Sequence, residues 1–131
     1  MSMKFKIILF FVSFCSTIFA QKINTDSLLV VTNNIIKSDQ KDYFKAKKMA
    51  YQCLKIVPDY LDFHIALGRI HKNEKSLDSA RYYFQHVINA NPKYKEAFVF
   101  LSKTELDAKN NEAALTTINK GIAIYPEDKE F

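Results

Sequence analysis

The stretch from Leu61 to Tyr94, LDFHIALGRIHKNEKSLDSARYYFQHVINANPKY, decides the fold of this chain. Apolar side chains recur in its first half at three- and four-residue spacing, as they do along one face of a helix. The polar residues 73–75 interrupt that pattern. A second apolar stripe predicts another helix from about Leu77, which ends before Pro92 because a proline disfavours helical geometry in the preceding residue. The stretch therefore predicts two helices joined by a short turn.

The same design recurs along the chain with a period of 34 residues. The markers of the period are Pro58, Pro92 and Pro126, together with Ala46, Ala80 and Ala114. They divide the chain into units at 27–60, 61–94 and 95–128. One such unit cannot bury its apolar face alone, so neighbouring units must supply the core. With two glycines and three prolines in 131 residues, the composition also favours helices over hairpins. We expect an all-α solenoid of three helix-turn-helix units.

The first twenty residues differ from the rest of the chain. Lys4 and Lys6 precede an apolar stretch at 7–14 that is shorter than the roughly 20 residues needed to span a hydrocarbon core. Ala20 supplies a small residue at a plausible cleavage point. This pattern predicts a signal peptide at 1–20 and a mature repeat domain at 21–131, in an exported protein that is periplasmic or associated with the cell envelope. The alternative interpretation is an uncleaved N-terminal anchor.

The charge is only mildly basic. The whole chain has 19 basic and 14 acidic residues, and loss of Lys4 and Lys6 would leave 17 against 14. The lysines are scattered over helical faces and export separates the chain from nucleic acid, so we predict no nucleic-acid partner and only indirect contact with membranes. Cys53 is the single cysteine after residue 20, which precludes an internal disulfide in the mature chain. Its place on the apolar stripe predicts a buried core residue.

Nothing in the sequence predicts catalysis. His64 and His71 are seven residues apart, about 10 Å along a helix, which is too far for one metal ion. We expect both histidines to be half-buried packing residues, and Asp59 and Asp62 to cap a helix and complement its dipole. There is no glycine-rich phosphate loop and no nucleophile motif. The predictions are therefore no catalytic residues, no metal, no cofactor and no enzymatic activity.

These residues resemble the tetratricopeptide repeat (TPR), a 34-residue helix-turn-helix family. The unit at 61–94 matches best, through Leu67, Gly68, Ala80, Phe84 and Pro92, with His64 and His71 where the family usually has Trp and Tyr. The third unit follows with Phe98, Leu101, Ser102, Ala114, Ile118, Gly121 and Pro126, and the first keeps Ala46, Ala50 and Pro58. Val30, Asn33, Asn34 and Lys37 depart from the pattern. The resemblance implies a right-handed α-solenoid of three TPR units that binds a protein or peptide partner.

In this family the first helix of each unit lines a concave groove, so the resemblance also implies candidate binding residues. The candidates are Asp62, Ile65, Arg69, Lys72, Glu96, Val99, Phe100 and Lys103, and the matching positions of the first unit are Leu28, Val31, Thr32, Ile35 and Ser38. Ile65, Val99 and Phe100 would form an apolar floor between an acidic and a basic edge. A peptide of mixed character could bind there. Alternatively, the charged residues only cap helices or face solvent.

A second hypothesis concerns the last helix. Its stripe, including Leu115, Ile118 and Ile122, lacks the polar capping helix that usually follows the last repeat. The chain could therefore be a structural stalk or assembly module that self-associates through this C-terminal helix. It could also be the leading part of a larger envelope or outer-membrane protein.

Overall fold

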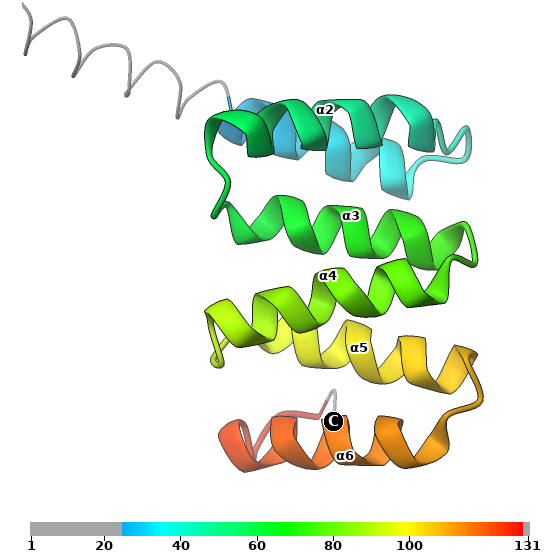
Figure 1. Cartoon of the computed structure of the whole chain (residues 1–131), viewed down its shortest axis with the longest axis vertical. Coiled ribbons are helices and arrows are strands. Elements are labelled where there is room, and N and C mark those ends of the chain that lie inside the picture. Colours follow the sequence, from blue (N-terminus) through cyan, green and yellow to red (C-terminus); the bar gives the residue numbers. More distant parts are fainter. Residues whose placement is uncertain (1–24, 130–131) are drawn as a thin grey trace, which may run out of the picture.

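The computed structural model describes residues 25–129, and the expected signal peptide at 1–20 lies outside them. The described chain is helical throughout, with no strand between residues 25 and 129. Its helices are residues 25–37, α2 (Tyr43–Ile56), α3 (Leu61–Asn73), α4 (Leu77–Ala90), α5 (Lys95–Asp107) and α6 (Asn111–Ile124). Successive helices are stacked along the long axis of the molecule (Figure 1).

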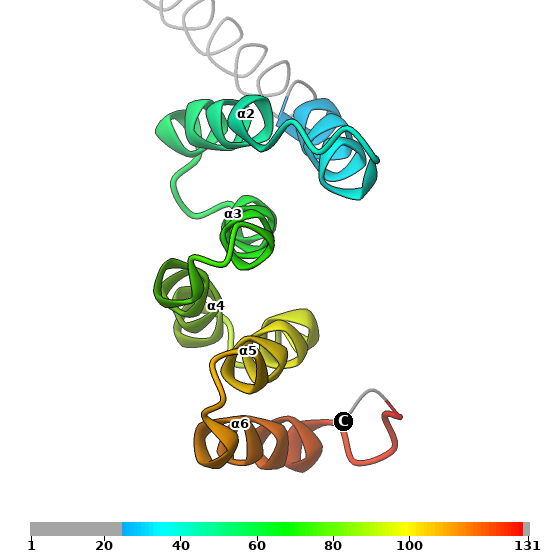
Figure 2. The same cartoon turned by 90° about the vertical axis from the view of Figure 1, so that its right-hand side faces the viewer.

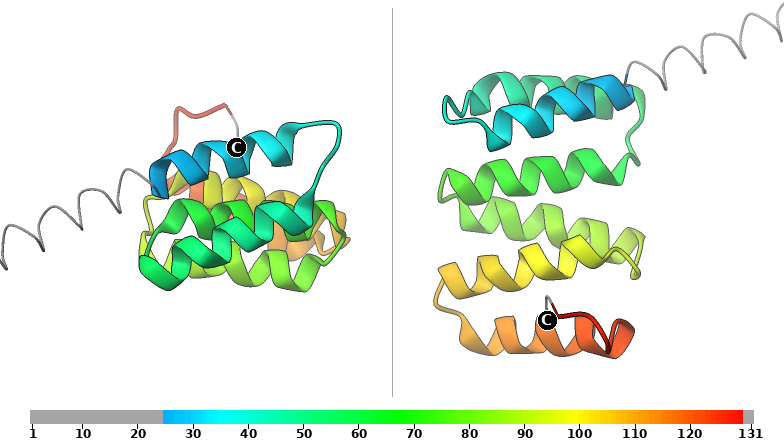
Figure 3. Two further views of the ribbon diagram at one scale, coloured as in Figure 1. Left: turned by 90° about the horizontal axis from the view of Figure 1, so that it is seen from above. Right: turned by 180° about the vertical axis from the view of Figure 1, so that it is seen from behind.

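The stack has two layers. Figure 2 shows helix 25–37, α3 and α5 on one side and α2 and α4 on the other, with α6 beneath α5, and Figure 3 shows the stack from above and from behind. In the first two pairs, each layer therefore holds one helix of the pair. This arrangement confirms the predicted all-α solenoid. None of the described helices is both long and apolar enough to cross a membrane.

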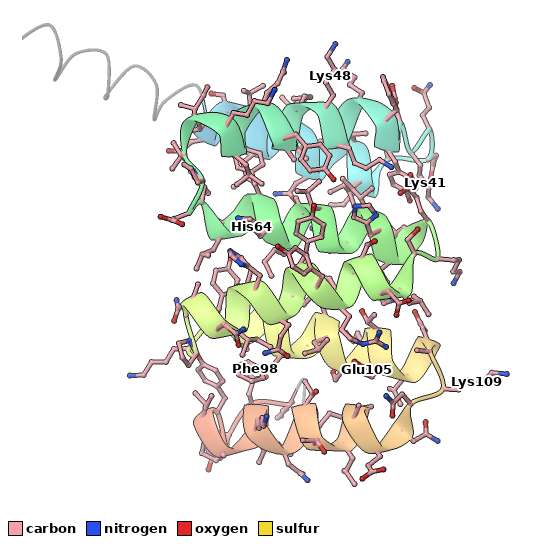
Figure 4. The ribbon with its side chains drawn as sticks, in the orientation of Figure 1. Lys41, Lys48, His64, Phe98, Glu105 and Lys109 are labelled. Atoms are coloured by element: carbon pink, nitrogen blue, oxygen red, sulfur yellow. The ribbon has the colours of Figure 1, made fainter. Side chains whose placement is uncertain are left out.

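The turn inside each helix pair uses a left-handed residue. Lys41, Lys75 and Lys109 have φ values of 43°, 63° and 59°, so they repeat with the same 34-residue period as the prolines. Lys41 and Lys109 mark the ends of two of these turns in Figure 4. Residues other than glycine rarely adopt this left-handed backbone conformation. The tight reversal between paired helices nevertheless imposes it on a lysine in each of the three turns.

The start of α3 differs from the expectation. Its N-cap residue is Tyr60, and no side chain caps the helix, so the predicted capping by Asp59 and Asp62 is wrong. Asp62 does lie in the first turn, where a carboxylate complements the helix dipole. Its carboxylate accepts a hydrogen bond from the Tyr94 hydroxyl at the end of the same unit. A contact between distant parts of the chain has replaced the local cap.

The central core joins three helices. Ile65, Ala80, Phe84, Val87, Ala97 and Leu101 form one buried cluster over α3, α4 and α5. Gly68 is essential to its geometry, because a Cβ atom there would lie 2.4 Å from Cε1 of the Phe84 ring. The expected close approach of α3 and α4 is therefore present. Cys53 is fully buried between α2 and α3, as predicted, and burial raises the pKa of its thiol.

Candidate functional site

A pocket of about 200 Å³ lies on the layer formed by the first helices of the pairs. It is lined by Ile36, Arg69, Lys72, Asn73, Phe100 and Lys103. These residues come from helix 25–37, α3 and α5, so all three units contribute to it. Four of the eight predicted binding residues meet here: Arg69, Lys72, Phe100 and Lys103.

Arg69 connects the walls of this pocket. Its guanidinium carbon lies 5.4 Å from the centre of the Phe100 ring, and its Nη1 donates a 3.1 Å hydrogen bond to Oδ1 of Asn33. The cation therefore rests on an aromatic face, a favourable contact that leaves other guanidinium donors unused. Burial lowers the pKa of Arg69 from its ordinary value. Within residues 25–129, no carboxylate forms an ion pair with it.

The two lysines of the pocket differ in their partners. Nζ of Lys72 lies 2.7 Å from Oδ2 of Asp107, and this contact lowers the pKa of that carboxyl. Lys103 is exposed and has no ion pair among the described residues. The pocket therefore carries two cations, Arg69 and Lys103, that no acidic group in this part of the chain neutralises.

The other four predicted residues do not line the pocket. Ile65 and Val99 are only 7% and 6% exposed, so they lie beneath the surface rather than forming an accessible floor. Asp62 bonds to Tyr94, and Glu96 is exposed near the start of α5. The expected acidic edge thus lies toward the opposite end of the helices from Lys72 and Lys103.

Sequence reasoning missed part of the first unit's contribution. It pointed to Val31, Thr32 and Ile35, yet Ile36 lines the pocket and Asn33 accepts the bond from Arg69. Thr32 is fully buried, and its hydroxyl donates to the Leu28 carbonyl oxygen at 2.7 Å. The missed signal was Asn33 itself, a short amide at a position that the family fills with leucine.

A second cluster of ring side chains lies among α2, α3 and α4. The ring of His71 stacks on Tyr83 at 5.5 Å, and His64 lies 4.3 Å from His86, between α3 and α4 (Figure 4). The Tyr83 hydroxyl in turn faces the Tyr51 hydroxyl at 3.2 Å. His64 and His71 are half-buried, as predicted, and this confirms a packing role.

The ring nitrogens of the histidine cluster make few hydrogen bonds. Nε2 of His64 lies 2.9 Å from the Pro58 carbonyl oxygen, while Nδ1 of both His64 and His71 has no hydrogen-bond partner. From residue 25 to residue 129, no group of three or more His, Cys, Asp or Glu side chains is placed to hold a metal ion. Burial lowers the pKa of both rings, so the folded chain favours their neutral forms.

Stacked helix pairs that build a pocket across three units define an α-solenoid of the helical-repeat class. Residues 61–94 match the family model of the tetratricopeptide repeat. This match covers one of the three units, and together with the six sequentially packed helices it fits a tetratricopeptide repeat protein. A comparison with curated proteins gives no match. Tetratricopeptide repeats are in general scaffolds for protein–protein interaction, and the match supports a scaffold of this kind.

Proposed function

We propose that this chain is an exported interaction scaffold of the cell envelope, which binds an acidic peptide segment of a partner protein in the pocket around Arg69. The observation that carries the proposal is the pairing of two unneutralised cations, Arg69 and Lys103, with the ring of Phe100 in one pocket. A carboxylate would supply the ion pair that Arg69 lacks. An adjacent apolar side chain would contact the ring.

The geometry of Arg69 favours a carboxylate over other anchors. A guanidinium group offers a planar fork of donors that matches a carboxylate bidentately, and the contacts with Phe100 and Asn33 already restrict its position. Holding the side chain in place beforehand reduces the conformational entropy lost on binding. Lys103 adds a second, more flexible charge nearby. The pocket therefore suits a peptide with at least two acidic residues beside an aromatic or aliphatic one.

The export part of the proposal rests on the sequence of residues 1–20, with its basic start, short apolar stretch and Ala20. Mass spectrometry of the protein recovered from the envelope fraction of expressing cells tests it. We expect the N-terminus to be Gln21. Recovery of the intact chain from the cytoplasm would contradict export.

Peptide binding tests the groove directly. We expect fluorescence anisotropy to show binding of peptides rich in Asp and Glu next to Phe or Leu, and weaker binding of basic peptides of the same length. The double variant R69E/K103E should bind the acidic peptides at least about tenfold more weakly, because each reversal replaces attraction with repulsion. The matched control is K93E/K120E, which makes the same charge change at two exposed lysines outside the pocket. Equal loss in both variants would refute a specific groove.

The exposed apolar residues of α6 favour a second candidate function, assembly through this helix. Leu115 is 59% exposed and Ile122 is 40% exposed, and Ile118 lies between them on the same stripe. Light scattering over a range of concentrations would detect the association, and Ile118→Asp should abolish it. If that variant abolishes association while R69E/K103E changes no binding, the assembly function replaces the groove function.

A further inference from the structure

The outward face of α2 combines aromatic and basic side chains in one stripe. Phe44, Lys48, Tyr51 and Lys55 follow the spacing i, i+4, i+7 and i+11, which places them along one face of a helix. Phe44 is 78% exposed and Tyr51 is 42% exposed, and both lysines are exposed. The opposite face of α2 holds the buried residues Ala46, Ala50 and Cys53. In Figure 4, Lys48 points away from the rest of the stack.

The other two units show that the fold does not require this stripe. Moving along the chain by the 34-residue period gives the equivalent positions on α4 and α6. These are Asp78, Tyr82, Gln85 and Asn89 on α4, and Glu112, Thr116, Asn119 and Ala123 on α6. Neither set contains a lysine, and each begins with an acidic residue. Packing alone therefore does not account for Phe44, Lys48 and Lys55, whereas Tyr51 also contacts Tyr83 of α4 through its hydroxyl.

The charge of the molecule is also concentrated at this end. The unit at 27–60 contains six lysines and three acidic residues, whereas residues 61–128 contain nine basic and nine acidic residues. Helix α2 itself carries four lysines and no acidic residue. One of them, Lys47, is paired with Glu74 and lies on the side facing α3. The remaining three are exposed and without an ion pair among the described residues.

In place of the indirect membrane contact expected from the sequence, we propose that the outward face of α2 binds an anionic membrane surface directly, with the helix lying parallel to the bilayer. Lysines near a surface of anionic lipids are attracted to the headgroups, and aromatic rings partition into the interfacial region. The exposed ring of Phe44 favours a lipid surface over nucleic acid, because it can enter the boundary between headgroups and acyl chains. The pocket around Arg69 shares no residue with this stripe, so both sites can be occupied together.

The chain contains no tryptophan, so Phe44→Trp introduces a unique fluorescent reporter on the stripe. The full chain carrying this change should show a blue-shifted emission with vesicles of phosphatidylcholine and phosphatidylglycerol in equal parts. It should show no shift with phosphatidylcholine alone. Tyr82→Trp is the matched reporter on α4, at an exposed position equivalent to Lys48, and its emission should not shift with either vesicle.

Residues 1–24 are identical in both reporter chains, and a response caused by that segment alone should not depend on Lys48 and Lys55, which the charge-removal test below changes. Equal shifts for the two reporters would overturn the proposal, as would an equal response to neutral vesicles. A shift of the Phe44→Trp emission with single-stranded RNA but not with anionic vesicles would also overturn it, in favour of nucleic acid.

Charge removal gives an independent test in the same full-length reporter. Vesicle affinity should fall about fivefold for each lysine lost, and roughly thirtyfold for K48Q/K55Q. The control K93Q/K120Q removes two exposed lysines elsewhere and should leave the affinity within about twofold of the parent. Equal losses in the two variants would overturn the proposal. Since all four positions are exposed, unfolding curves should coincide, and this check excludes a folding defect as the cause.

Discussion

At the scale of single residues, Gly68 is required by the ring that packs against it. A Cβ atom at this position would lie 2.4 Å from Cε1 of Phe84, and that ring is fully buried and cannot move aside freely. Gly68→Ala would gain about 1 kcal/mol in helix propensity, but overpacking costs typically about 1–3 kcal/mol. We expect a net loss of about 1 kcal/mol in the free energy of unfolding, measured by urea denaturation.

The double variant G68A/F84L distinguishes this clash from a general effect on α3. Leucine at position 84 shortens the side chain that the new methyl group would meet, so the two changes should be less destabilising together than the sum of each alone. A strictly additive result would show that Gly68 is not needed for the close approach of the two helices.

At the scale of elements, a charged pair joins α4 and α5 in addition to the central core. Nε and Nη2 of Arg81 donate to the two carboxylate oxygens of Glu105 at 2.6 and 2.9 Å, and the Glu105 side chain is only 5% exposed. Arg81→Ala would leave that carboxylate buried and unpaired. Because Arg81 is itself 36% exposed, we expect a loss of about 2 kcal/mol, below the 3–5 kcal/mol typical of deeply buried pairs. R81M/E105L should be less destabilised than R81A in urea denaturation, and an equal loss would contradict this explanation.

The contacts of α3 with α2 and α4 should weaken in mild acid. Burial lowers the pKa of His64 and His71 below their ordinary value of 6.5. Below that pH the unfolded chain therefore binds more protons at these two residues than the folded chain does. Stability should therefore fall as the pH decreases from about 6.5, and level off once the pH is below the folded pKa values. Urea midpoints at about pH 7.5 and about pH 5.5 measure the effect. In H64F/H71Y the urea midpoint should fall less between these two pH values. If it falls as much as in the parent chain, other titratable groups cause the loss of stability.

Elements were more predictable from the sequence than their contacts. The start of α4 at Leu77 and the stop before Pro92 follow from local rules, because spacing and proline geometry act within a few residues. The partner of Asp62 did not follow from them, since Tyr94 is 32 residues away. The groove positions of the family, counted along the first unit, predicted Ile35, whereas Ile36 lines the pocket. This difference too depends on contacts between distant parts of the chain. The angle between neighbouring helices, which local sequence does not encode, decides which edge of a helix faces the pocket.

At the scale of the whole molecule, a solenoid has no single core, and its stability is distributed among neighbouring units. Helix α6 buries only small residues, Ala114, Thr117 and Gly121, whereas α3 and α4 bury Phe63 and Phe84. Because little apolar surface holds α6 to its neighbour, we expect its amides to exchange faster than those of α3 and α4 in native-state hydrogen exchange.

The concentration dependence of that exchange also tests assembly through α6. If Leu115 and Ile122 are covered by a second copy, the protection of α6 should rise with protein concentration while that of α3 stays constant, because only association buries the α6 stripe. In Ile118→Asp the rise should disappear. Protection of α6 that equals that of α3 at every concentration would contradict both expectations, since it would mean that the small buried residues hold α6 as firmly as the aromatic core holds the centre of the stack.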